Sequence, residues 1–115
     1  MIKVVIAGSR TFNDYELLKT KMDAILQNQT EVEIVSGTAY GADQLGERYA
    51  QERGYPVKRF PAQWEKFGRR AGYLRNEEMA NYASHVVVFT NGSKGSQHMI
   101  DISTRLGLPL RIVRF

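Results

Sequence analysis

The sequence contains no cysteine, which excludes disulfide bonds, thiolate metal ligands and cysteine nucleophiles, and fits a reducing compartment. It also lacks a long hydrophobic run, because the longest, VVIA and VVVF, are far shorter than the ~20 residues that span a membrane. No signal-peptide pattern precedes the first of these runs. These absences predict a cytoplasmic protein that has no membrane partner.

Histidine is scarce as well. The two histidines, His85 and His98, do not have the spacing of metal ligands, and no cluster of carboxylates accompanies them. We therefore expect neither a metal site nor a cofactor.

The residues that are present are typical of one globular domain. The chain has 115 residues, of which 43% are hydrophobic and 24% are charged, so we expect a single domain over residues 1–115 with one modest core. The formal net charge of +4 favours anionic partners such as nucleotides or nucleic acid, although a solvated basic surface explains it equally well.

Five short runs rich in β-branched residues predict strands, over residues 2–7, 32–35, 57–60, 85–90 and 110–113. Continuous apolar runs suit parallel strands that are covered on both faces. Four helical patterns lie between them: one capped by Asp14, and others over about 41–54, 68–82 and 96–106. The residues expected to face the core are Leu17, Leu18, Met22, Ile25 and Leu26, then Leu45 and Tyr49, then Ala71, Leu74 and Met79, and finally Met99, Ile102 and Leu106.

The alternation of strands and helices predicts an α/β fold, a Rossmann-like three-layer sandwich around a five-stranded parallel sheet. The expected strand order is 3-2-1-4-5. In that order the chain reverses direction across the sheet between strands 1 and 4. Ligands of open α/β sheets bind outside the carboxyl ends of the strands at such a switch point.

Three loops that bear glycine follow strands 1, 2 and 4, namely GSRTFND (8–14), SGTAYGAD (36–43) and NGSKGSQH (91–98). Glycine allows the backbone to approach a ligand, and the first amides of the following helices can bind a phosphate. Hydroxyl donors and cations accompany them: Ser9, Thr38, Ser93, Ser96, Arg10, Lys94 and Arg75. Turn geometry and capping alone also explain such loops. None matches the P-loop or the dinucleotide fingerprint.

Five motifs occur in an order that resembles the YspA-type branch of the SLOG superfamily: GSR, SGTAYGAD, FPAQW, GRRAGYLRNEEM and NGSKGS. This Rossmann-like group also contains the LOG phosphoribohydrolases and the DNA-processing protein DprA. The resemblance covers nearly the whole chain and implies a nucleotide or nucleotide-derived ligand, which is sensed or sequestered. The expected binding residues are Gly8, Ser9, Arg10, Ser36, Gly37, Thr38, Ala39, Gly41, Asp43, Trp64, Arg75, Asn76, Gly92, Ser93, Lys94, Gly95 and Ser96.

One departure weakens the analogy with the LOG enzymes. Their motifs are P-G-G-x-G-T-x-x-E and R-K-x-x-M; Arg75 and Met79 match the second, but Met99 stands where the first has its glutamate. Glycosidic cleavage needs a carboxylate near the anomeric carbon, and a thioether cannot transfer a proton. If the protein is an enzyme, Asp43 and Glu77 are the candidate catalytic residues.

Several of these residues have an ordinary structural explanation besides the functional one. Asp43 suits the first turn of a helix, or it contacts a ribose or acts in catalysis. Trp64 stacks on a base, or it covers the core or a subunit interface. Arg75 contacts a phosphate or forms a surface ion pair. Arg69 and Arg70, at the start of the third predicted helix, face an anion, a neighbouring subunit or solvent.

Three functional hypotheses remain open at this point. The first is a module that binds a nucleotide. The second is a hydrolase that cleaves an N-glycosidic or phosphate bond of such a ligand. The third is a protein that binds single-stranded DNA, as DprA does, through Lys66, Arg69 and Arg70. A homodimer or higher homo-oligomer is expected for a small open sheet of this family.

Overall fold

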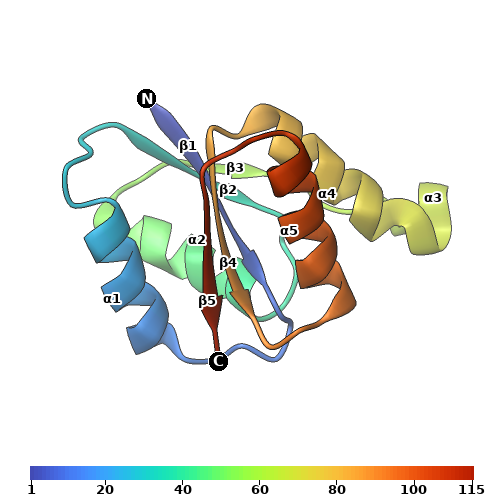
Figure 1. Cartoon of the computed structure of the whole chain (residues 1–115), viewed down its shortest axis with the longest axis horizontal. Coiled ribbons are helices and arrows are strands. Elements are labelled where there is room, and N and C mark those ends of the chain that lie inside the picture. The colour runs from blue at the N-terminus through green and yellow to red at the C-terminus, as the bar shows by residue number, and fades with distance from the viewer.

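The computed structural model describes residues 1–115 as a parallel sheet between two layers of helices (Figure 1). The strands are β1 (Ile2–Gly8), β2 (Val32–Ser36), β3 (Val57–Arg59), β4 (His85–Thr90) and β5 (Leu110–Arg114). The helices are α1 (Tyr15–Ile25), α2 (Ala42–Arg53), α3 (Trp64–Phe67), the 3-10 turn η1 (Gly68–Arg70), α4 (Ala71–Tyr82) and α5 (Lys94–Arg105). None of these helices has the length and apolar character needed to cross a membrane.

The sheet has the predicted strand order, β3-β2-β1-β4-β5, and every pair of neighbouring strands is parallel. The central strand β1 pairs through Ile2 with Val32 of β2 and through Val4 with His85 of β4. From β1 the chain continues to β2 and β3 on one side of β1, and then crosses to β4 and β5 on its other side. The Rossmann-like α/β fold and its switch point between β1 and β4 are confirmed.

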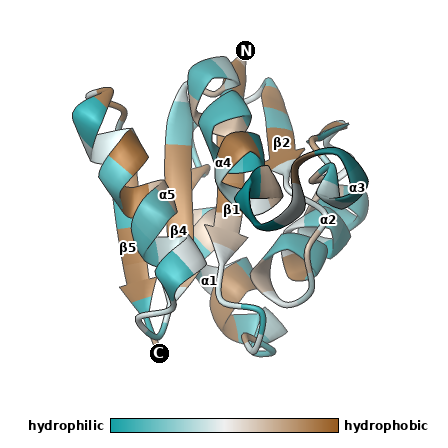
Figure 2. Ribbon diagram, turned by 90° about the vertical axis from the view of Figure 1, so that its right-hand side faces the viewer, coloured by the Kyte–Doolittle hydropathy of each residue, from teal (hydrophilic) through white to brown (hydrophobic).

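Alternate residues of the strands pack on opposite faces of the sheet. Val4 and Ile6 pack against the layer formed by α1 and α2, whereas Val5 and Ala7 pack against α4 and α5. Figure 2 shows apolar residues concentrated along the inner strands, while α3 and the turn after it are mostly hydrophilic. Burial on both faces explains why these strands read as continuous apolar runs.

Three details differ from the prediction. Residues 64–67, expected to lie in a loop, form the short helix α3, which is too short to show a helical period. Leu106, expected in the core, is 45% exposed because α5 ends at Arg105. On α2, Gly46 and Tyr49 are buried, whereas Leu45, which was expected to face the core, is only partly buried.

Candidate functional site

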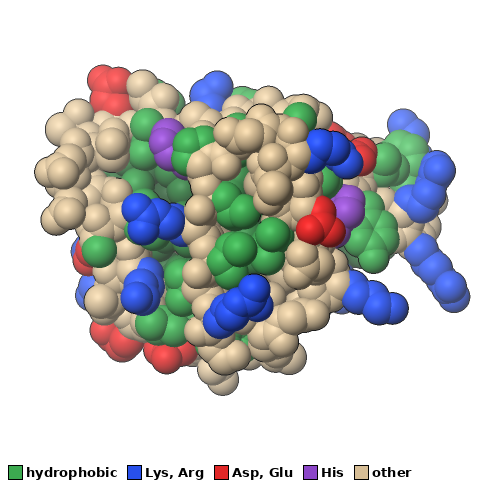
Figure 3. Space-filling view, viewed as in Figure 1, with side chains coloured by type: hydrophobic (Ala, Val, Ile, Leu, Met, Phe, Trp, Pro, Cys, Tyr) green, Lys and Arg blue, Asp and Glu red, His purple; other side chains and the backbone are tan.

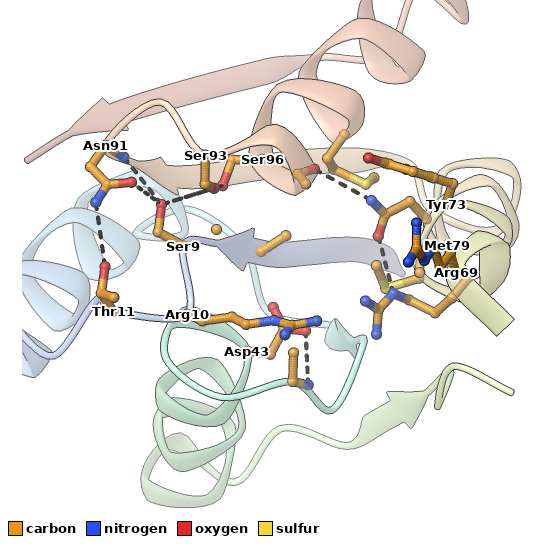
Figure 4. A pocket seen from close by; sticks show the side chains of 18 of the residues that line it. Ser9, Arg10, Thr11, Asp43, Arg69, Tyr73, Met79, Asn91, Ser93 and Ser96 are labelled. Carbon is orange, nitrogen blue, oxygen red and sulfur yellow. Dashed lines mark hydrogen bonds between the residues drawn. The ribbon is translucent and has the colours of Figure 1, made fainter. Parts of the chain in front are cut away.

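The loops after β1, β2 and β4 meet at the carboxyl edge of the sheet, and with α3 to α4 they surround a cavity of about 450 Å³ (Figure 4). The predicted site residues that line it are Gly8, Ser9, Arg10, Ala39, Asp43, Trp64, Arg75, Asn76, Ser93, Gly95 and Ser96. Its volume lies within the range of small-molecule sites. The switch point of the sheet thus carries a cavity that is lined by residues from all three predicted loops.

Side-chain hydroxyls gather at one end of this cavity. The Ser9 hydroxyl donates to Asn91 Oδ1 at 2.7 Å and lies 3.2 Å from the Ser93 hydroxyl, which in turn lies 2.7 Å from that of Ser96. The backbone amide of Asn91 donates a hydrogen bond to Ser9 Oγ at 3.2 Å. The contacts join the end of β1 to the start of α5, and hydroxyls of this kind can turn to donate to an anion.

The first turn of α5 adds backbone donors to the same end. No backbone or side-chain acceptor within the chain takes the amide hydrogens of Lys94, Gly95 and Ser96, since the first amide bonded in the helix is that of Gln97, which donates to Ser93 O at 3.0 Å. A β-carbon added at Gly95 would meet nothing within 4 Å. Free amides, the positive end of the helix dipole and open space together suit a phosphate.

Arg75, in α4, is held in a fixed position at the other side of the cavity. Its Nη1 donates to the Gly37 carbonyl oxygen, and its Nε donates to Asn76 Oδ1 at 3.1 Å. The buried Asn76 side chain in turn donates to His98 Nδ1 at 3.2 Å. Burial lowers the pKa of the His98 imidazole, which favours the neutral ring that can accept this bond. Residues of α4, of α5 and of the loop after β2 therefore set the orientation of the guanidinium.

Asp43, in the first turn of α2, is the one buried carboxylate of the chain, with 4% of its surface exposed. It lines the cavity, and its Oδ2 accepts the Ala39 amide hydrogen at 3.1 Å. Burial raises the pKa of Asp43 to about 6, against the opposing effects of the Ala39 bond and the nearby Arg75 charge. A carboxyl group of this kind can exchange protons near neutral pH.

The arginines of the cavity form no ion pair with a carboxylate, and Asp43 is the one carboxylate that lines it. The ion pairs of the chain join Met1 to Glu31, Arg48 to Glu52, Arg53 to Asp23 and Arg59 to Glu47. Arg10, Arg69 and Arg75 line the cavity and take part in none of them. The Arg10 guanidinium instead lies 6.0 Å from the centre of the Trp64 ring. The cavity therefore holds positive charge that an anionic ligand can neutralise.

Comparison with known proteins places this geometry in a family. Residues 2–67 match the family described as "YspA, cpYpsA-related SLOG family". The chain belongs to this SLOG family. It is also 31% identical to Gene 61 protein of Mycobacterium phage D29 over 118 residues, covering 96% of this chain and 94% of the phage protein. The resemblance inferred from the five motifs is thereby confirmed.

A solved structure shares the fold of this SLOG protein. It is DNA processing protein A from Helicobacter pylori, described with a single-stranded DNA binding mode, and its TM-score is 0.71 at 17% identity. The comparison covers 96% of this chain but 64% of that chain, so this protein spans less than two thirds of its structural neighbour. The likeness establishes the Rossmann-like architecture of the SLOG domain.

Two glycines of the second loop, Gly37 and Gly41, lie in close contact with other parts of the protein. A β-carbon at Gly37 would lie 2.7 Å from both Arg75 Nη1 and Asp43 Oδ2, and one at Gly41 would lie 2.4 Å from Ser9 O. These distances are shorter than any ordinary contact. A side chain at Gly41 would collide with the backbone of Ser9 and Arg10, whereas one at Gly37 would displace the side chains of Arg75 and Asp43.

The remaining predicted residues lie outside this cavity. Ser36 is buried and donates to Glu47 Oε2 at 2.6 Å, Gly41 precedes α2, and Gly92 and Lys94 are exposed beside the cavity without lining it. Glu77, the second candidate catalytic residue, is exposed and does not line it either. Gly37 and Thr38 line a neighbouring cavity instead.

Sequence reasoning also missed residues that line the cavity, chiefly Tyr73, Thr11 and Asn91. Tyr73 contacts the cavity from α4, with its ring centre 4.5 Å from that of His98. The available signal was the three-residue spacing that places Tyr73 near Asn76, a predicted binding residue, on one side of the helix. Met99, which occupies the position of the LOG glutamate, is buried and lines the cavity. The departure from the LOG pattern therefore lies at the site itself.

Proposed function

We propose that this SLOG protein binds a nucleotide or nucleotide-derived ligand in the 450 Å³ cavity and senses or sequesters it. The observation that carries the proposal is the end of the cavity at α5, which is lined by Gly95 and Ser96, whose amides are free, and by Ser9 and Ser93, which add hydroxyls. Three unpaired arginines line the same cavity. Phosphate is the ligand group that matches donors of this kind.

The loop of residues 36–43 suits a different part of the ligand. Two of its amides are already used, because Thr38 N donates to Ser36 Oγ and Ala39 N donates to Asp43 Oδ2, each at 3.1 Å. The Asp43 carboxylate beside them repels a phosphate but accepts hydrogen bonds from hydroxyl groups. The phosphate accordingly belongs at α5, and the ribose hydroxyls belong at Asp43.

Calorimetry and thermal unfolding with a panel of nucleotides test the proposal. We expect one member to bind, and at 100 times its dissociation constant to raise the free energy of unfolding by about 2.7 kcal/mol. Gly95→Asp places a negative charge in the open space at the α5 terminus, where it suits the helix dipole and preserves the fold. This variant is expected to weaken binding at least tenfold.

Gly95→Asn is the matched control, because asparagine has the shape of aspartate without its charge. If the phosphate lies at α5, the asparagine variant binds at least tenfold more tightly than the aspartate variant. Equal affinities would contradict the placement of the phosphate. If no nucleotide changes the unfolding temperature, the proposed function is wrong.

Hydrolysis of the ligand is a second candidate, supported by Asp43 alone. The carboxyl group is buried in the cavity and its pKa is raised to about 6, which suits general acid or base catalysis near neutral pH. Chromatography of the same nucleotide mixtures separates binding from turnover. Product formation that Asp43→Asn abolishes while binding persists favours a hydrolase; unchanged nucleotides favour a sensor.

Binding of single-stranded DNA is the third candidate. Lys66, Arg69 and Arg70 are exposed on α3 and η1, and basic side chains project from the end of the molecule that carries α3 (Figure 3). The fold is shared with a protein described as binding single-stranded DNA. DNA binding through these cations requires an affinity that falls steeply with salt. For the protein as a whole, we propose a cytoplasmic location and a homodimer or higher homo-oligomer.

A further inference from the structure

A second cavity of about 640 Å³ adjoins the first. The two cavities share Arg10, Ala39, Trp64 and Arg75 as lining residues. The shared wall consists largely of exposed side chains, since Arg10 extends over the Trp64 ring and half of the Trp64 surface (50%) is exposed. Arg10 and Trp64 can turn aside at little cost while Arg75 stays in place, so the wall does not isolate the cavities from each other.

The second cavity suits a flat ring rather than another phosphate. Two aromatic rings line it, Trp64 and Tyr40, and 72% of the Tyr40 surface is exposed. Pro61 and Ala62 add apolar surface, and no carboxylate lines the cavity. Exposed aromatic rings beside apolar walls are the surfaces on which bases stack.

The charge of the shared wall is positive. Arg10 and Arg75 both belong to it, and neither has a carboxylate partner. A molecule that occupies both cavities must pass these guanidinium groups, which bind phosphate oxygens in a bidentate manner. The connecting part of such a molecule is therefore anionic.

The backbone of the second cavity is strained at one position. Thr38 lines it and has a φ of 63°, a left-handed conformation that a β-branched residue rarely adopts. The Ser36 hydroxyl, which accepts the Thr38 amide hydrogen, helps to hold this conformation. Strain of this kind is common where a loop has been shaped for a ligand.

We propose that the two cavities form one bipartite site for a molecule in which two nucleoside units are joined through phosphate. The first unit occupies the first cavity, with its 5′-phosphate at α5 and its ribose at Asp43. A second phosphate joins that ribose to the second unit and lies between Arg10 and Arg75, and the second base stacks on Trp64 and Tyr40. The inference rests on the proposed nucleotide binding and extends it to a second unit. Two successive nucleotides of a DNA strand share this chemistry, so the experiment distinguishes a small molecule from a strand.

Calorimetry compares the four 5′-ribonucleotides with the four 5′-phosphorylated dinucleotides in which two copies of one nucleoside are joined 3′ to 5′ by one phosphate. For the preferred base, we expect the two-nucleoside compound to bind at least tenfold more tightly than the mononucleotide. Tyr40→Ala alters only the second cavity and is expected to remove most of this difference, while the affinity for the mononucleotide changes less than twofold. Tyr73→Ala, in the first cavity only, is the matched control and weakens both ligands.

The outcomes separate this inference from the proposed function. Equal affinity for one-unit and two-unit compounds, or an equal loss for both with Tyr40→Ala, overturns the bipartite site while nucleotide binding stands. Failure of all eight compounds to bind overturns both. A third arm uses single-stranded DNA of two and of twelve nucleotides: affinity that rises with length and falls steeply with salt assigns the two units to a strand, and its absence assigns them to a small molecule.

Discussion

At the scale of single residues, Asp43 combines a structural cost with a functional position. It is a buried carboxylate whose pKa is raised to about 6 from 3.8, and the native state must keep it ionised at neutral pH. A group with a raised native pKa contributes its full stability below the unfolded value and loses it as the pH rises through the native value. The protein therefore loses stability through Asp43 between about pH 4 and pH 6.

The variant Asp43→Asn is expected to remove this loss, because the amide stays neutral and its oxygen can still accept the Ala39 amide hydrogen. A pKa difference of two units corresponds to about 3 kcal/mol. We expect the variant to be more stable than the wild type by roughly 2–3 kcal/mol at pH 8 and about equally stable at pH 4, by urea denaturation. A stability difference that does not change with pH would contradict this account. Asp101→Asn, at an exposed position, serves as the control.

At the scale of elements, the ends of the helices are determined by local residues. The Asp14 side chain accepts the Leu17 amide hydrogen at 3.1 Å at the start of α1, as its position in the sequence predicts. The chain turns away from α2 at Gly54, whose φ is 75°. α1 covers the same face as α2 through Leu18 and Met22, so its stability contributes to that of the whole core.

Asp14→Ala is expected to lower the free energy of unfolding by about 1 kcal/mol, because the Leu17 amide loses its acceptor. Asp14→Asn keeps an acceptor of the same shape and is expected to cost much less. Chemical denaturation of both variants measures the difference. If asparagine is as harmful as alanine, the contribution comes from the charge of Asp14 rather than from its hydrogen bond.

At the scale of the whole molecule, self-association remains a prediction from the size and family of the chain. Apolar side chains are exposed just after α5 and in and just after β5, with Leu106 at 45%, Ile112 at 40% and Phe115 at 47%. Light scattering at micromolar concentration is expected to give at least twice the chain mass of 13.1 kDa. A monomer would contradict the prediction of self-association.

Much of the architecture follows from local pattern. The boundaries of β4 were predicted without error, and the other strands differ from the prediction by one residue. The three glycine-bearing loops were located correctly because each directly follows a strongly apolar run in the sequence. Helix α3 was missed because four residues show no period, and Leu106 was assigned to the core because periodicity does not reveal where a neighbouring layer ends.

The sequence by itself determined the alternation of strands and helices, the caps, and the loops that follow β1, β2 and β4, since each depends on neighbours along the chain. Only the tertiary structure decided what the loops do: Gly37 and Gly41 make room for Arg75, Asp43 and Ser9, and the free amides lie at α5. It also joined Asn76 to His98 and set Arg10 beside Trp64. These contacts join segments that are far apart in the chain. The packing of the helices on the sheet sets the distances between them, and a local sequence pattern does not predict those distances.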